Sequence, residues 1–132
     1  MKAAAMYLLT AVVTGAHASW MASEMIWGAP PNPLHFISFG GSILLLVAAL
    51  RFRASPRTRA KIGLGGCVAA WCLYAPLSVL CAFMPYTMGE EVRLFLSLRE
   101  YVPLVGLFGG SILLVATTVY TILLLMGSRR TL

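Results

Sequence analysis

Four polar side chains fall near the middle of long apolar segments, and they are the residues of this sequence best placed to do chemistry. His17 is the ionisable one, while Ser42, Tyr74 and Ser111 lie at similar positions in three other segments. Hydrocarbon penalises polar groups unless they are paired, so such residues often mark proton, ion or substrate sites. With a helical rise of about 1.5 Å per residue, the four predict one polar layer across a helix bundle.

This polar layer has two interpretations. In one, His17 stays neutral and hydrogen-bonds a serine or tyrosine across a helix interface. In the other, the layer is a small midplane site for a proton, a cation or a polar solute. Glu24 follows His17 by seven residues on the same helical face, and with His35 it forms a candidate outer-face site. Alternatively, Glu24 is a solvated interfacial carboxylate beside Trp20 and Trp27.

The sequence predicts no cofactor and no metal. By helical rise, His17 and His35 differ in depth by on the order of 15 Å, which is too far for both to bind one haem iron. Met21 and Met25 carry thioethers that suit Cu(I), but flexible core packing is the simpler use of methionine. The cysteines lie within one apolar segment without a C-x-x-C pair and are expected to be small packing residues: Cys67, Cys72 and Cys81.

Composition places these residues in a membrane. The 132 residues are 60% hydrophobic and 11% charged, with a mean hydropathy of +0.87. A small soluble domain cannot bury that much apolar surface, because a large part of its surface remains exposed to water. The sequence therefore predicts an integral membrane protein.

Four apolar segments have the length of about 20 residues that a bilayer requires. Their expected bounds are 3–27, 34–52, 62–84 and 101–126. Residues 28–33 interrupt them with glycine and three prolines, residues 51–61 with basic side chains, and Pro85 with the charged stretch that follows. We expect an all-α integral membrane protein, a four-transmembrane-helix bundle forming a single membrane domain over 1–132. Residues 90–100 have one polar and one apolar side, which predicts a short interfacial helix or a docking surface for a neighbouring subunit.

The net charge of +6 is unevenly distributed. Lys2, the loop 51–61 and the tail after 126 hold most of the basic residues, and four spans would bring them to one side of the membrane. By the positive-inside rule that side is the cytoplasm. We therefore expect a multi-pass protein of the cell (inner) membrane with both termini cytoplasmic, anionic lipid against the basic loop 51–61, and no nucleic-acid partner.

The N-terminus has an alternative interpretation. Lys2, an apolar run and the triplet Ala16-His17-Ala18 resemble a signal peptide with a small-residue cleavage site. Apolar character resumes after the triplet, so we expect this segment to be retained as the first span.

The heptapeptide FGGSILL occurs twice, as Phe39–Leu45 and as Phe108–Leu114. Each copy follows a proline by a few residues and begins a span that runs in the same direction. The simplest explanation is a tandem-duplicated two-helix hairpin, with halves related by an axis along the membrane normal. The first and third spans show no clear match.

Small residues occur at four-residue spacing in every span, which predicts close helix packing, because packing rather than hydrophobicity holds helices together in lipid. Pro76 should kink the third span, since it removes a backbone hydrogen bond. The glycines expected to serve helix packing are Gly15, Gly40, Gly41, Gly66, Gly106, Gly109 and Gly110.

The sequence contains no phosphate-binding loop, carboxylate pair, nucleophile elbow or cluster of metal ligands, so we expect no enzyme. Two functional classes remain. The chain is either a non-catalytic accessory or structural subunit of a larger membrane complex, or a small homo-oligomeric transporter or channel with a polar site around His17. The scarcity of polar residues in the spans favours the first, with other membrane subunits or further copies of the chain as partners.

Overall fold

The computed structural model is all-helical over the residues that it describes. Four helices are present: α1 (Lys2–Ile26), α2 (Pro33–Leu50), α3 (Pro56–Thr87) and α5 (Tyr101–Arg130). The backbone is described for residues 2–26, 33–51, 53–87 and 101–130, and the side chains for residues 2–19, 33–51, 53–79 and 106–127. The interfacial helix expected at 90–100 lies outside these ranges.

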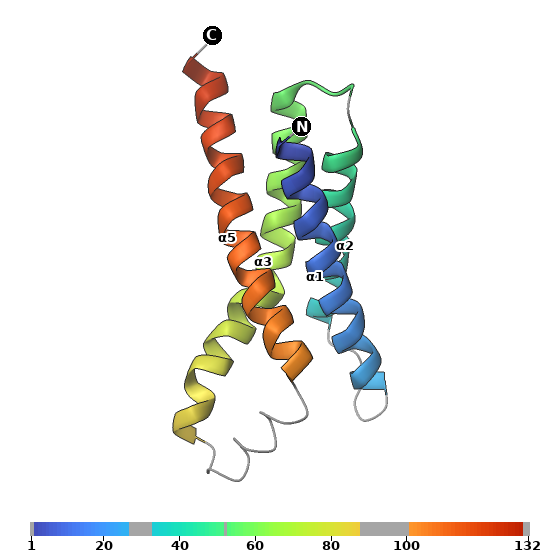
Figure 1. Ribbon diagram of the computed structural model, residues 1–132, viewed down its shortest axis with the longest axis vertical. Helices are drawn as coiled ribbons and strands as arrows, with labels where there is room; N and C mark the ends of the chain where they lie inside the picture. The colour runs from blue at the N-terminus through green and yellow to red at the C-terminus, as the bar shows by residue number, and fades with distance from the viewer. Residues whose placement is uncertain (1, 27–32, 52, 88–100, 131–132) are drawn as a thin grey trace.

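The helices form a bundle in which each packs against two others. The neighbouring pairs are α1 with α2, α2 with α3, α3 with α5, and α5 with α1. Figure 1 shows both chain ends and the connection between α2 and α3 at the same end of the bundle. The basic residues of this connection therefore lie at the end where Lys2 begins α1.

Three helices of the described chain are long and apolar enough to cross a membrane, over Pro33–Leu50, Pro56–Val79 and Gly106–Gly127. Many large apolar side chains on their outer faces are exposed, including Phe36, Val68 and Phe108. Such a surface suits lipid rather than water. Three apolar helices of this length are compatible with a membrane protein. Helix α1 does not reach the same hydropathy among its described residues.

Helix α3 begins at Pro56, earlier than the residue 62 predicted from the end of the basic stretch. Ser55 caps the helix, because the Thr58 N–H donates to Ser55 Oγ at 3.2 Å. Pro56 then occupies the first helical position, where its missing N–H costs nothing. Arg57 and Arg59 therefore belong to the first turn of α3 and not to a loop.

Arg59 closes the end of α2. Its Nε donates to the Ala48 carbonyl at 2.8 Å and its Nη2 donates to the Ala49 carbonyl at 3.2 Å. Carbonyls in the last turn of a helix have no partner within the helix, and a cation there also complements the helix dipole. One side chain thus joins the start of α3 to the end of α2.

Helices α2 and α3 make their closest approach at two glycines. A Cβ atom on Gly41 would lie 2.7 Å from the Gly66 carbonyl oxygen, and one on Gly66 would lie 2.8 Å from the Gly41 carbonyl oxygen. These distances are too short for any side chain, so the two backbones touch directly. Gly41 and Gly66 therefore lie where small residues allow two helices to approach closely.

The two copies of FGGSILL place most of the same positions inward and outward, although Ser42 is buried and Ser111 only half-buried. Phe39 and Phe108 are both exposed, and Leu45 and Leu114 are both fully buried. The shared inward face extends beyond the heptapeptide, since the buried pairs, each 69 residues apart, are Ser38 and Leu107, Gly41 and Gly110, Leu45 and Leu114, and Ala48 and Thr117. The spacing of three, four and three residues is that of one helix face.

Gly40 and Gly109 make no close contact within this chain. No atom lies within 4 Å of the position of a Cβ on either residue. Both glycines occupy the second position of the repeat, which points away from the bundle. Gly63 was not predicted to pack, yet a Cβ there would lie 2.6 Å from the ring of Tyr7.

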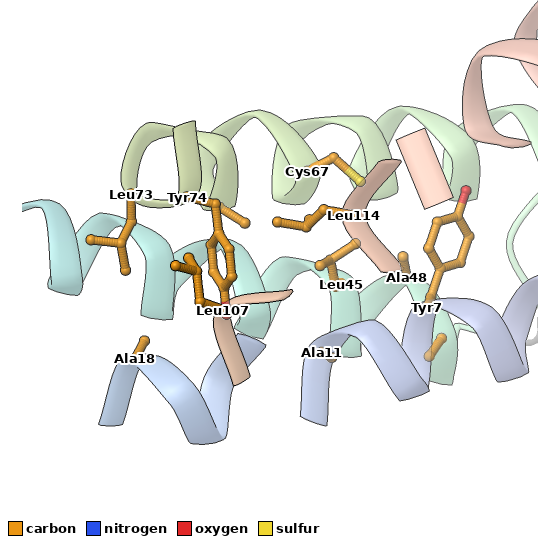
Figure 2. Close-up of a cluster of buried hydrophobic side chains, with 12 residues drawn as sticks. Tyr7, Ala11, Ala18, Leu45, Ala48, Cys67, Leu73, Tyr74, Leu107 and Leu114 are labelled. Carbon is orange, nitrogen blue, oxygen red and sulfur yellow. The ribbon is translucent and has the colours of Figure 1, made fainter. Parts of the chain in front are cut away.

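The core contains small aliphatic residues and two tyrosines. Figure 2 shows Tyr7 and Tyr74 with Leu45, Leu114 and Cys67 between them. Cys67 is buried and free and serves as a small packing residue. Cys72 is exposed and free, and Cys81 lies outside the described side chains.

Helix α3 continues through Pro76, and Figure 1 shows it changing direction along its length. A proline inside a helix removes the hydrogen bond to the carbonyl four residues earlier, here that of Cys72, and its ring pushes against that turn. Pro76 accounts physically for a change of direction in the helix.

Gly40 and Gly41 offer a matched pair of substitutions for the contact between α2 and α3. We expect Gly41→Ala to lower the free energy of unfolding by about 1–3 kcal/mol, because the new methyl group overlaps α3 backbone. Gly40→Ala has open space and should leave stability unchanged or raise it by up to about 1 kcal/mol. Thermal unfolding in mild detergent measures both, and equal melting temperatures for the two variants would contradict the contact.

Candidate functional site

Four polar residues of α1 face the inside of the bundle. Tyr7, Thr10, Thr14 and His17 follow one another at spacings of three or four residues, and all four are buried. This spacing places them along a single face of the helix. The face of α1 directed at the other helices is thus its polar face.

Hydroxyl groups on this face connect α1 to two neighbouring helices. The Tyr7 hydroxyl lies 2.8 Å from Thr121 Oγ1, and Thr10 Oγ1 lies 2.7 Å from Thr117 Oγ1. Both contacts join α1 to α5. Thr14 Oγ1 lies 2.8 Å from Ser42 Oγ and joins α1 to α2. We call these six residues the hydroxyl network.

Each hydroxyl carries one proton, which fixes part of the network's direction. Thr10 donates its proton to the Met6 carbonyl at 2.8 Å. Thr10 therefore accepts from Thr117, which must be the donor of that pair. Thr14 Oγ1 and Ser42 Oγ also lie 2.7 and 3.1 Å from the carbonyls four residues earlier. These two hydroxyls have two protons for three contacts, so one donates to the other, and only the accepting hydroxyl donates to its carbonyl. The protons of the network are directed at partners between or within helices and not into an open space.

His17 and Tyr74 lie against each other one level further along the bundle. Their ring centroids are 5.3 Å apart with an interplanar angle of 48°. Helix α5 leaves room for both rings at two glycines. A Cβ on Gly106 would lie 2.8 Å from His17 Cδ2, and one on Gly110 would lie 2.6 Å from Tyr74 Cε1. These two glycines, which were predicted to pack, therefore lie directly against the rings of His17 and Tyr74.

The four residues predicted as one polar layer occupy three separate contacts. His17 contacts Tyr74, Ser42 belongs to the hydroxyl network, and Ser111 lies 3.5 Å from Ser78 Oγ in a half-buried position. The predicted layer is thus divided between neighbouring levels. Gly15 lies beside Ser42, where a Cβ would be 3.4 Å from Ser42 Cβ.

His35 lies closer in depth to His17 than the sequence suggested. The contact between Thr14 and Ser42 fixes the register of the antiparallel helices α1 and α2. From that level His17 is three residues away and His35 seven, which correspond to about 4.5 and 10.5 Å. The two histidines therefore differ in depth by about 6 Å and not 15 Å. The larger value came from the sequence alone, which does not show how α1 and α2 are aligned.

Several buried polar atoms have no hydrogen-bond partner within the described residues. They are both ring nitrogens of His35, Ser38 Oγ and the Tyr74 hydroxyl oxygen. His35 is 3% exposed, and the other two residues are fully buried. A buried polar atom without a partner costs about 1–3 kcal/mol. With His17, these residues form a second polar group, in the half of the bundle away from the basic connection.

The described residues contain no group of three or more histidine, cysteine, aspartate or glutamate side chains that could hold a metal ion. The side chains of Glu24, Met21 and Met25 lie outside the described residues, so the outer-face site expected from Glu24 and His35 is represented here by His35 alone.

Sequence reasoning missed most of the hydroxyl network. Tyr7, Thr10 and Thr14 precede His17 at helical spacing, and this pattern was a usable signal for a polar face. Their partners on α5 carry no comparable signal, because threonine is common in membrane helices and pairing depends on how the helices are rotated. Trp71, whose Nε1 donates to Thr118 Oγ1 at 3.1 Å, was missed for the same reason.

Comparison with protein-family models, with curated proteins and with solved structures finds no match to this chain. Function is therefore argued from the geometry of the bundle itself.

Tyr7 and Tyr74 provide a matched test of the two polar groups. Tyr7→Phe should lower the free energy of unfolding by about 0.6 kcal/mol, with an upper bound of about 1.7 kcal/mol, because it removes the hydrogen bond to Thr121. Tyr74→Phe removes a hydroxyl without a described partner, so stability should stay the same or rise. Unfolding of both variants in mild detergent measures this difference, and an equal loss in both would mean that the Tyr74 hydroxyl is bound to something.

Proposed function

We propose that this chain is a non-catalytic accessory or structural subunit of a larger membrane complex. The observation that carries the proposal is that the hydroxyl groups of the hydroxyl network hydrogen-bond between helices. Thr10 bonds to a threonine of α5 and to a backbone carbonyl, and Thr14 and Ser42 bond to each other, which leaves these hydroxyls unavailable to a passing solute. An interior built in this way holds helices together and does not line a path.

The outward face of α5 is the best candidate for contact with a partner subunit. In its apolar segment 28% of the residues are buried, compared with 33% in α3 and 39% in α2. The exposed side chains follow one another along one side of the helix: Phe108, Ile112, Val115, Val119, Leu123 and Met126. Among these three segments, that of α5 has the most surface left for another subunit.

We also propose that α1 crosses the membrane as a fourth span. Its lower hydropathy comes in part from Thr10, Thr14 and His17, all of which are buried in the bundle. Because hydropathy counts such residues as if they faced lipid, it underestimates a helix whose polar face is internal. With four spans, both termini and the basic loop would lie on one side, which the positive-inside rule assigns to the cytoplasm of a cell (inner) membrane.

The shared inward faces of α2 and α5 support descent of the two halves from one hairpin. Four pairs of positions 69 residues apart are buried in both helices, and the order of neighbours around the bundle is compatible with a two-fold axis along the membrane normal. The duplication remains our proposal, since α1 and α3 share no matching sequence.

The alternative function is a small homo-oligomeric transporter or channel with a midplane polar site. The specific observation in its favour is the second polar group, where His35, Ser38 and Tyr74 hold buried polar atoms without described partners. Water, a cation or a polar solute would satisfy them. This function requires that His17→Ala abolish flux through the reconstituted protein in liposomes.

The mass of the protein in mild detergent decides between the two functions. An accessory subunit should be found with larger subunits at fixed stoichiometry, and Ile112→Trp should reduce that fraction several-fold by obstructing the α5 face. Ile37→Trp is the matched control, because Ile37 is also an exposed isoleucine and belongs to α2.

Either of two results would contradict the accessory role. The first is a homo-oligomer without other subunits, combined with flux that His17→Ala abolishes. The second is an equal effect of Ile37→Trp and Ile112→Trp on the complex.

A further inference from the structure

Two hollows lie along one side of α2. The first is a groove between α1 and α2, with Ala11, Gly15 and Ala16 on one wall and Phe39, Ile43 and Leu46 on the other. The second lies at the end of α2 and is lined by Leu50, Arg51, Arg53 and Ala54. Both open to the outside of the bundle.

The two hollows share one helix face. Phe39, Ile43, Leu46 and Leu50 are spaced by four, three and four residues, which places them in a row along α2. All four are exposed, between 37% and 58%. The row thus runs from the apolar groove to the basic end of the helix, where Arg51 and Arg53 follow.

We propose that these two hollows together bind one anionic phospholipid, with an acyl chain in the groove between α1 and α2 and the phosphate at Arg51 and Arg53. The inference requires only that these helices lie in a membrane, so it is independent of the accessory role.

The groove suits an acyl chain. Its lining is apolar apart from Ser42, whose hydroxyl is already engaged by Thr14 and by the Ser38 carbonyl. The groove therefore presents no unsatisfied polar atom. Phe39 and Leu50 are eleven residues apart, or about 16 Å along the helix axis, which matches one leaflet of a hydrocarbon core about 30 Å thick.

The basic end suits a phosphate. Arg51 and Arg53 are exposed, whereas the neighbouring Arg59 donates to the carbonyls that end α2. Residues 33–87 contain no aspartate or glutamate that would compete for these arginines. Basic side chains beside a transmembrane groove are a recurrent arrangement for anionic headgroups.

The headgroup contact is tested by two charge-matched variants of the full chain. Native mass spectrometry from mild detergent measures retained phosphatidylglycerol, with phosphatidylcholine as the neutral comparison. We expect Arg51→Gln with Arg53→Gln to reduce phosphatidylglycerol retention about tenfold. Arg57→Gln with Lys61→Gln removes the same charge from exposed residues outside the hollow and should have little effect. Equal losses in both variants would overturn the site in favour of diffuse attraction to the loop.

The contact between the acyl chain and the groove is tested with phosphatidylglycerol that carries a diazirine on its acyl chain. We expect photolysis in vesicles to label peptides of α1 and α2, and Ala16→Leu to abolish that labelling by filling the groove. Ala116→Leu, at an exposed alanine of α5, is the matched control and should keep it. Labelling that is uniform over all helices, or unchanged by Ala16→Leu, would overturn the proposal, as would a partner helix crosslinked in the groove in place of lipid.

Discussion

Hydrocarbon offers no hydrogen-bond partner to a side chain, and the arrangement of this bundle depends on that constraint. Thr10, Thr14 and Tyr7 each have a polar group that lipid cannot satisfy, and each finds its partner on α5 or α2. The polar face of α1 therefore determines how this helix is rotated. It also explains why α1, which is less apolar than the three candidate spans, makes hydrogen bonds to two neighbours.

The bundle also requires that helices approach one another closely, and its glycines allow this. Gly41 and Gly66 bring the backbones of α2 and α3 into contact, while Gly106 and Gly110 make room for His17 and Tyr74. Polar contacts thus hold α1 in place, whereas small residues hold α2 against α3. The outward faces stay apolar and leave a groove beside α1 and an uncovered side on α5. We propose that lipid occupies the groove and that a partner subunit covers the exposed side of α5.

Much of the fold followed from the sequence because length, apolarity and prolines are local properties. The helices lie close to the four predicted segments, and α3 differed at its start because Ser55 and Pro56 form a helix beginning inside a basic stretch. The site was harder to predict. Which glycine packs, Gly41 or Gly40, depends on helix rotation, and the division of the predicted polar layer depends on the register that Thr14 and Ser42 set.

The central claim is that α1 crosses the bilayer with its polar face inward. Single cysteines at Lys2, Pro33 and Ser55, with the native cysteines replaced by alanine, test it through labelling of sealed vesicles by a membrane-impermeant thiol reagent. The account predicts that Lys2→Cys and Ser55→Cys react from one side and Pro33→Cys from the other. Reaction of Lys2→Cys and Pro33→Cys from the same side would contradict it, because α1 would then not cross the membrane.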